Sequence, residues 1–528
     1  MKIAVIASPY PVEEIPTVPL GISYVAAAFA SAGAEVQIFD FVINSYSPEK
    51  LKAELDRFDP DIVGANSVTL NFKTAADIIT TVKEYNPDII TVMGGPHVSF
   101  DVINTLREYP AIDMIVIGEG ERTAIELVSK FRNRSSWKEV RGIAFRENGN
   151  IVITEPRPFI EDLDALPLPA RYLLPLSRYR ALGYPPSIIT GRGCPYSCIF
   201  CLGRRMVGKK PRQRSASLIV DEIEEILSYG FSMINIADDL FTANREKVTY
   251  VCREIDRRGL KFVWTAFARV NTVDKETLEI MSSSGCQWIS FGLESGNAEM
   301  LRRVKKAATL DQARHAVGLC KEAGIRPHGS FIAGLPGESP ETLEETIAFG
   351  EELNIDYGFH FLAPFPGTTI MEKKEKYDIE ILTYDWSRYD ANSPVTRTSR
   401  LSSDHACEII GRFNNEANRK WQQLEKGYLE RTNSPEDDLR VAGSYRLKLV
   451  LEILTNDLIE RTGIIKGANG NRRYAQNVLE QHLCTKTGCD AELVRTTVES
   501  FVGQGLIKTR RAGDGLEWFW TRNNRIEN

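Results

Sequence analysis

The chain has 528 residues, of which 43% are hydrophobic, 26% charged and 9% aromatic. This composition is typical of a packed globular protein and excludes disordered, fibrous and collagen-like classes, while the length predicts several domains. The formal net charge of −6 excludes a protein that nucleic acid coats along its length. No stretch reaches the roughly eighteen apolar residues of a membrane span, and the start lacks the basic segment of a secretory signal, so we expect a cytoplasmic protein.

Residues 1–150 alternate short apolar runs with helix-length segments, which predicts a doubly wound parallel sheet of the Rossmann-like type. The expected strands are 2–7, 36–40, 61–66, 89–93 and 114–117. Ligands of such sheets bind at the carboxyl ends of the strands. The loops at those ends carry the candidate cofactor residues Asn66, Ser67, Val68, Thr69, Gly94, Gly95, Pro96, His97, Gly118, Glu119 and Gly120. No G-x-G-x-x-G follows the first strand, so a dinucleotide is the weaker prediction.

Residues 151–186 are rich in proline and aperiodic, which predicts an extended linker. From 187 to 385 the alternation resumes, with strands expected at 188–190, 232–237, 262–266, 288–292, 327–333 and 359–363. Six such units predict a partial (β/α)6 barrel with its chemistry at the carboxyl ends of the strands. The fold class is therefore α/β. Residues 386–440 are expected to be helical. Residues 441–528 are expected to form a winged-helix-like domain, because helices precede a hairpin on Gly513-Asp514-Gly515.

Cys194, Cys198 and Cys201 form a C-x3-C-x2-C motif directly after the first expected barrel strand. Three thiolates on one loop can hold three irons of a [4Fe-4S] cluster and leave the fourth iron open to another ligand, which indicates catalysis. A zinc site is the alternative, but structural zinc requires a fourth protein ligand, and no cysteine or histidine follows nearby. The sequence therefore favours a cluster in a catalytic role.

This loop, with Phe200 before its last cysteine, resembles the cluster loop of the radical S-adenosylmethionine (radical SAM) superfamily. The resemblance implies that SAM chelates the open iron and that Phe200 lies beside the adenine. It also implies SAM contacts in two later strands, at Gly292, Glu294, Ile332 and Gly334. For Glu294 the alternative is an ion pair with an arginine such as Arg269.

For three polar residues that follow barrel strands, the sequence allows more than one role. Arg269, after the third strand, is a SAM or substrate contact or a member of an ion pair at the rim. Asp238 and Asp239 follow the second strand and are candidate substrate residues, with a helix cap as the alternative.

The N-terminal sheet carries a second resemblance. Residues 19–22, 94–97 and 118–121, placed ahead of such a core, resemble the cobalamin-binding branch of the superfamily. That branch includes class B radical SAM methyltransferases and anaerobic magnesium-protoporphyrin ester cyclases. Because D-x-H-x-x-G is missing, we expect cobalamin to bind base-off without a histidine ligand, and His97 to hydrogen-bond the backbone or the cofactor tail.

The implied reaction moves a methyl group from SAM through methylcobalamin to an unactivated carbon, after a 5'-deoxyadenosyl radical has removed a hydrogen atom. One alternative is a non-methylating cyclase, oxidoreductase or ring-rearranging enzyme with the same cofactors. A second is a cobalamin-responsive regulator that binds DNA through the winged helix. Nucleic acid is otherwise not expected as a partner, because the C-terminal domain lacks a strongly basic face.

The substrate is expected to be a small molecule or a peptide. Six basic residues and no acidic one lie close to the cluster motif, at Arg204, Arg205, Lys209, Lys210, Arg212 and Arg214. Such a run is either a solvated surface or a docking site for an acidic, low-potential electron donor such as flavodoxin or ferredoxin.

Overall fold

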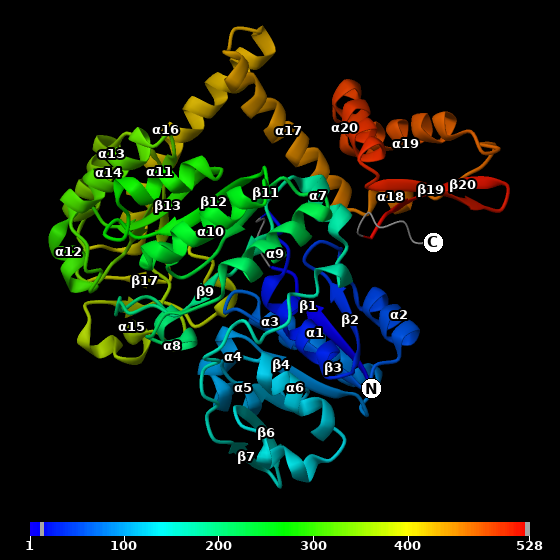
Figure 1. The fold of residues 1–528 in the computed structure, drawn as a ribbon, viewed down its shortest axis with the longest axis horizontal. Helices are drawn as coiled ribbons and strands as arrows, with labels where there is room; N and C mark the ends of the chain where they lie inside the picture. Colours follow the sequence, from blue (N-terminus) through cyan, green and yellow to red (C-terminus); the bar gives the residue numbers. More distant parts are fainter. Residues whose placement is uncertain (11–14, 523–528) are drawn as a thin grey trace.

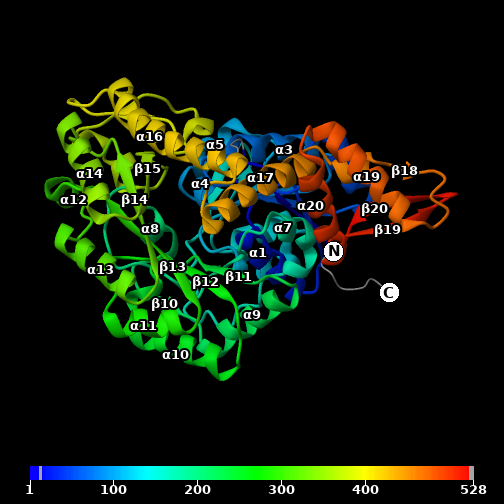
Figure 2. The ribbon, with the colours of Figure 1, turned by 90° about the horizontal axis from the view of Figure 1, so that it is seen from above.

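The computed structural model describes residues 1–10 and 15–522, so the end of the predicted C-terminal domain, 523–528, lies outside the described residues. Figure 1 shows three parts: a blue-to-cyan N-terminal sheet, a green curved sheet with its helices, and an orange-to-red helical region. The last two helices, α19 (Arg472–Thr487) and α20 (Ala491–Gly503), and the curved sheet lie at opposite ends of the molecule (Figures 1 and 2). In the described part of the chain, no helix is long and apolar enough to cross a membrane.

The N-terminal sheet has the strand order β2-β1-β3-β4-β5-β6-β7. All five predicted strands are present: β1 (Lys2–Ala7), β2 (Glu35–Asp40), β3 (Ile62–Asn66), β4 (Ile90–Gly94) and β5 (Met114–Val116). They pair in parallel, whereas β6 (Ile143–Glu147) and β7 (Asn150–Ile153) extend the sheet as an antiparallel hairpin. The sheet therefore reaches Ile153, slightly beyond the predicted boundary at residue 150.

Alternate residues of the central strands pack on opposite faces of this sheet, as the pleat requires. Ile3 and Val5 belong to the core that includes α1 (Leu20–Ser31) and α6 (Glu121–Lys130). Ala4 and Ile6 belong to the core on the other face. That face is covered by α2 (Pro48–Phe58), α3 (Phe72–Tyr85), α4 (Pro96–Phe100) and α5 (Val102–Glu108). Helices on both faces make the sheet doubly wound.

The second sheet has six parallel strands in the order β15-β14-β13-β12-β11-β8. They are β8 (Ser187–Ile188), β11 (Met233–Ile236), β12 (Val263–Ala268), β13 (Cys286–Glu294), β14 (Arg326–Ala333) and β15 (Asp356–Phe361). Its helices include α9 (Ala216–Ser228), α10 (Arg245–Arg257), α11 (Lys275–Ser283), α13 (Leu310–Glu322) and α14 (Pro340–Leu353). Strands β8 and β15 do not pair with each other, so the barrel is partial, as predicted.

The C-terminal region begins with a long helical hairpin of α16 (Ser403–Glu430) and α17 (Pro435–Thr455). The helices α18 (Leu458–Arg461), α19 (Arg472–Thr487) and α20 (Ala491–Gly503) follow. A small antiparallel sheet accompanies them, with β18 (Ile464–Ile465), β20 (Gly515–Trp520) and β19 (Ile507–Ala512) in that spatial order. The winged-helix assignment of this region stays a prediction.

The proline-rich linker is ordered and joins the parts by buried polar contacts. Its helix α7 (Leu176–Leu182) carries Tyr179, whose hydroxyl donates to the buried carboxylate of Asp40 at 2.8 Å. Arg171, also in the linker, lies 2.6 Å from the carboxylate of Glu222 on α9, which pairs with Arg214 as well. All three of these charged side chains are almost fully buried. The linker is therefore a packed element between the two sheets.

We predict that Glu222→Gln lowers the free energy of unfolding by about 3–5 kcal/mol, because it leaves two buried arginines without their carboxylate. The control is Glu224→Gln on the same helix, whose exposed pair with Arg258 is worth at most ~1 kcal/mol. Urea denaturation followed by circular dichroism measures both. Equal losses in the two variants would contradict this account of the linker.

Candidate functional site

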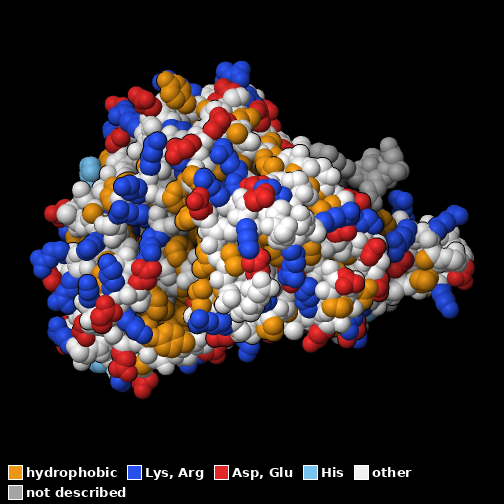
Figure 3. Space-filling view, turned by 90° about the horizontal axis from the view of Figure 1, so that it is seen from below, with side chains coloured by type: hydrophobic (Ala, Val, Ile, Leu, Met, Phe, Trp, Pro, Cys, Tyr) orange, Lys and Arg blue, Asp and Glu red, His pale blue; other side chains and the backbone are white. Residues whose placement is uncertain are grey.

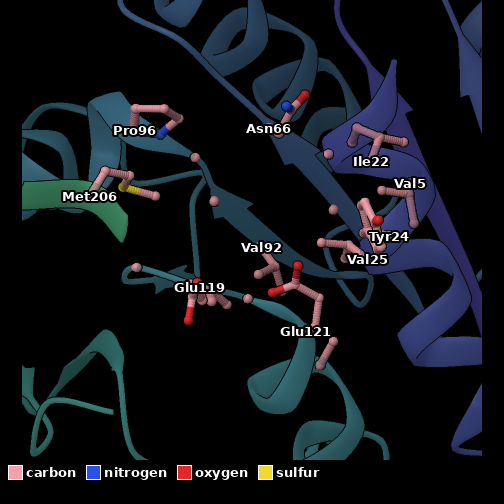
Figure 4. A pocket seen from close by; sticks show the side chains of 18 of the residues that line it. Val5, Ile22, Tyr24, Val25, Asn66, Val92, Pro96, Glu119, Glu121 and Met206 are labelled. Carbon is pink, nitrogen blue, oxygen red and sulfur yellow. The ribbon is translucent and has the colours of Figure 1, made fainter. Parts of the chain in front are cut away.

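A cavity of about 390 Å³ lies where the carboxyl ends of the two sheets face each other. One wall comes from β1, β3, β4, β5 and α1, and is mostly apolar. The other wall includes residues that follow β8 and β11, together with the short helix α8 (Gly203–Val207). In Figure 4, Asn66 and Pro96 lie at strand ends of the first sheet, and Met206 approaches from α8. The cavity therefore joins the two predicted ligand-binding edges.

Seven of the predicted cofactor residues line this cavity, namely Asn66, Gly94, Gly95, Pro96, Gly118, Glu119 and Gly120. Ser67, Val68 and Thr69 are not part of its lining and support the loop from behind. Gly95 has a φ of 108°, and a Cβ there would lie 2.3 Å from the carbonyl oxygen of Ser67. Only glycine allows these two loops to approach so closely.

His97 lies beneath its loop rather than in the cavity. Its ring stacks on Phe72 at 4.1 Å between centroids and meets Trp386 edge-on. Its Nδ1 lies 3.3 Å from the Thr69 hydroxyl, and burial lowers the pKa of the imidazole to about 4. The side chain is therefore neutral at pH 7 and does not line the cavity.

The three-cysteine loop is closed by a short antiparallel pair, β9 (Gly191–Arg192) with β10 (Arg212–Gln213). The Cys194 N–H donates to the carbonyl of Gly208 at 3.1 Å. Ile199 is buried and pins the far side of the loop through backbone hydrogen bonds with Val304 and Ile370. The backbone thus fixes the loop on both sides before any metal is considered.

The thiols of this loop do not converge on one point. The pKa of the Cys201 thiol is raised to about 11 by desolvation, although the residue is partly exposed at the surface, and a bound cation would stabilise its thiolate. Within residues 1–10 and 15–522, no three cysteine, histidine or carboxylate side chains converge as they would around one metal ion. A cubane cluster binds each thiolate at a different corner and needs no such convergence.

The predicted SAM residues gather beside the cluster loop. Phe200 and Ile332 pack against one apolar cluster with Ile199 and Leu335. The carboxylate of Glu294 pairs with Lys306 at 2.6 Å, and both side chains are buried. The pair lies over Gly292, where a Cβ would be 2.6 Å from the Glu294 carboxylate. Gly334 has a φ of 86°, a conformation that favours glycine at the turn after β14.

Arg269 is not the ionic partner of Glu294, because Lys306 takes that place. The Arg269 guanidinium instead lies 3.7 Å from the Cys198 sulfur and 3.7 Å from the centroid of the Tyr196 ring. It also donates to the carbonyl of Lys306. Arg269 therefore links the cluster loop to the loop between α12 (Ala298–Arg303) and α13, a contact that the spacing of residues along the chain does not reveal.

The two aspartates after β11 have different surroundings. Asp238 accepts from the backbone N–H and hydroxyl of Thr190, at 2.6 and 2.5 Å, and burial raises the pKa of its carboxyl to about 6. These contacts hold the end of β8 and make Asp238 structural rather than a helix cap. Asp239 lines the cavity, and burial raises its pKa. Of the two, Asp239 faces the space where a ligand fits.

The basic run near the cluster loop is largely engaged in ion pairs. Arg212 and Arg214 are buried and pair with Glu119 and Glu222. Arg205 pairs with Glu372, and Lys210 lies 3.5 Å from Glu161. The charge available to an acidic protein at this surface is therefore smaller than the sequence indicates.

Two family models match the chain: "B12 binding domain" over residues 14–128 and "Radical SAM superfamily" over residues 188–350. An "Uncharacterized methyltransferase PH0819" from Pyrococcus horikoshii is 34% identical over 395 residues, which cover 74% of this chain and 86% of that protein. The "Anaerobic magnesium-protoporphyrin IX monomethyl ester cyclase" of Rubrivivax gelatinosus is 30% identical, over 72% of this chain and 70% of its own.

The chain belongs to the radical SAM superfamily, in its B12-binding branch. As a radical SAM enzyme it uses a [4Fe-4S] cluster and SAM, and its B12-binding domain takes cobalamin. This result favours the enzyme over the DNA-binding regulator considered above.

Solved structures share the radical SAM fold of this chain. The cobalamin-dependent enzyme OxsB, with aqua-cobalamin and SAM bound, has a TM-score of 0.66 at 17% identity, over 95% of this chain and 83% of its own. The radical SAM methyltransferase TsrM from Kitasatospora setae has a TM-score of 0.64 at 19% identity, over 76% and 84%. The agreement over 95% of the chain includes the C-terminal helical region.

We predict that Glu294→Gln weakens SAM binding by roughly 10-fold to 150-fold, because a hydrogen bond to a charged group is worth ~1.5–3 kcal/mol. Equilibrium binding of SAM to the reconstituted protein measures the effect. Glu299→Gln, which alters an exposed pair with Arg303 on the next helix, is the control and should leave affinity unchanged. Unchanged SAM affinity with a lower melting temperature in Glu294→Gln would mean that Glu294 serves only Lys306.

Proposed function

We propose that the protein is a cobalamin-dependent radical SAM methyltransferase that acts on an unactivated carbon of a small-molecule or peptide substrate. The observation that carries this proposal is the single cavity that joins the edge of the B12-binding sheet to the base of the cluster loop. The similarity to a methyltransferase over 86% of that protein's length supports methyl transfer. When bound, the cofactors supply a carbon-centred radical and a methyl group, and the protein supplies their placement.

We infer that the cavity takes the nucleotide tail of cobalamin in the base-off form. Small residues such as Gly64, Gly94, Gly118 and Gly120 open a slot between the sheet and α1, and its walls are apolar, as an aromatic base requires. The lining offers no histidine. His97, neutral and packed under its loop, is held by Thr69 and Phe72. These contacts support binding without a histidine on cobalt, with His97 shaping the loop.

On the other side, Cys194, Cys198 and Cys201 are the residues that would hold the cluster, and Phe200, Ile332, Gly292, Gly334 and Glu294 would hold SAM. Glu294 keeps one carboxylate oxygen on Lys306 and can offer the other to a ligand's donor groups. Arg269 orients the Cys198 side of the loop. Asp239 is a polar group of the cavity wall close to Gly203, two residues after Cys201, and is the candidate substrate contact.

On the face of the molecule seen from below, hydrophobic side chains gather along a hollow in the surface (Figure 3). An apolar hollow of this kind suits an organic substrate. A low-potential donor such as flavodoxin or ferredoxin is expected to deliver electrons to the cluster loop. The cytoplasmic location stays a prediction from the sequence.

A non-methylating cyclase is the second candidate, since the cyclase of Rubrivivax gelatinosus is 30% identical to this chain. The products distinguish the two functions. Methyl transfer yields S-adenosylhomocysteine together with 5'-deoxyadenosine, whereas cyclisation or oxidation yields 5'-deoxyadenosine alone. Incubation of the reconstituted enzyme with methyl-labelled SAM and a metabolite extract tests the proposal, and a labelled product identifies the substrate.

We predict that the anaerobically reconstituted chain holds about four irons and four sulfides, and that Cys198→Ala abolishes 5'-deoxyadenosine formation. The variant removes one of the three thiolates that would hold the cluster, which leaves only Cys194 and Cys201 on the loop. Cys407→Ala, an exposed thiol on α16, is the control and should retain both iron and activity. Retention of SAM cleavage by Cys198→Ala would refute the cluster assignment.

We predict that Gly64→Ile reduces cobalamin binding at least ~10-fold without lowering the melting temperature, because the side chain fills the slot while β-branched residues suit a strand. A Cβ at Gly64 meets only the Val92 carbonyl at 3.8 Å, so the sheet accommodates it. Gly318→Ile, an open position on the distant helix α13, is the control. Absorbance of bound cobalamin after gel filtration measures occupancy, and full occupancy in Gly64→Ile would place the cofactor elsewhere.

A further inference from the structure

Glu119 lies in the loop between β5 and α6, and its carboxylate accepts hydrogen bonds from residues that are distant in the sequence. It accepts from Arg212 at 2.7 and 2.9 Å, from Arg192 at 3.1 Å and from the Ile160 N–H at 2.7 Å. These donors occupy both oxygens. Glu119 lines the cavity, but its acceptor sites are used within the protein rather than left for a cofactor.

The two arginines belong to the strands that close the cluster loop. Arg192 lies on β9, two residues before Cys194, and Arg212 lies opposite it on β10. Arg212 also donates to the carbonyls of Ile160 and Val207, at 2.5 and 2.6 Å. Arg192 extends the network to Glu121 at the start of α6, at 2.5 Å. One buried network therefore spans from the B12-binding sheet to the base of the cluster loop.

The network is electrically balanced, with two carboxylates and two guanidinium groups whose side chains are at most 10% exposed. Burial alone would raise the pKa of Glu119, but the hydrogen bonds from Arg212 and Ile160 and the two positive charges outweigh burial and lower it. Glu119 therefore stays ionised at neutral pH. A charge at this depth is stable only with its partners in place, so separating the two domains here is costly.

We propose that Glu119 is a positioning residue, which with Arg192 and Arg212 locks the cobalamin-binding loop to the cluster loop and so sets the gap between the two cofactors. That the gap separates two cofactors rests on the proposed function, whereas the contact of Glu119 with the two arginines does not. Each loop is attached to the end of a strand. Contacts between the two loops therefore fix both the distance and the relative orientation of the carboxyl edges of the two sheets. The gap matters because group transfer depends steeply on the placement of the reacting groups.

The test compares Glu119→Gln with wild type and with Glu126→Gln. Glu126 is the matched control, since it lies on α6 and pairs with Arg157 and Lys130 but contacts neither strand of the cluster loop. The first measurement is amide hydrogen exchange of the full chain without cofactors. The second is pulsed electron paramagnetic resonance of the holoenzyme, which reports the distance between cob(II)alamin and the reduced cluster.

For Glu119→Gln we expect exchange about tenfold faster in residues 157–162 and 191–214 together, because a charge-assisted contact is lost from both. We also expect both cofactors to be retained with a broader distance distribution. Glu126→Gln should change exchange around its own helix and its partner Arg157, but not in 191–214. Arg212→Lys, which keeps the charge but loses the two-pronged geometry, provides the same test if Glu119→Gln does not fold.

Three results would overturn the inference. Loss of cobalamin with unchanged exchange in 191–214 would make Glu119 a cofactor ligand. A lower melting temperature with an unchanged distance distribution would make it merely structural. Unchanged exchange in all segments would show that Glu119 does not hold the two loops together. Because the exchange measurement uses cofactor-free protein, failure of the wild type to bind cobalamin would refute the proposed function without affecting this test.

Discussion

The buried carboxylate of Glu119, shared by Arg192 and Arg212, holds the carboxyl ends of two parallel sheets against one cavity. Parallel sheets present their functional loops at one edge only, so two cofactor sites can cooperate only if those edges face each other. The linker makes this orientation possible, because Tyr179 and Arg171 hold it to both sheets through Asp40 and Glu222. The ion pairs then set how closely the edges approach.

Within that frame, the site is shaped mainly by the backbone and by small residues. Gly95 lets two loops of the B12-binding sheet touch. Gly193 has a φ of 103°, and a Cβ at this position would lie 2.5 Å from the carbonyl oxygen of Lys210, so only glycine lets the cluster loop pass there. The thiols and the apolar slot then provide what the cofactors require. The chemistry belongs to the cofactors, and the chain contributes distance, orientation and exclusion of water.

The C-terminal region stabilises this arrangement from outside the site. Asp457, before α18, accepts from Ser45 at 2.6 Å, and Glu460 pairs with Arg178 of the linker helix. These contacts lie close to the carboxyl end of β2, the edge strand of the first sheet. The region therefore braces the linker and the sheet edge, a role that needs no DNA.

The sequence alone determined the parallel strands of both sheets, the partial barrel and the cluster loop, because hydrophobic periodicity and short motifs act locally, but it did not indicate the antiparallel pair β6 and β7. It also indicated the sheet edge at which we propose that cobalamin binds. Tertiary structure alone decided the partners of the charged residues. Glu294 pairs with Lys306 rather than Arg269, Asp238 holds Thr190, and Glu119 binds two arginines of another domain. These pairs join residues up to 93 positions apart, and their geometry depends on loop conformations that neither propensity nor periodicity specifies.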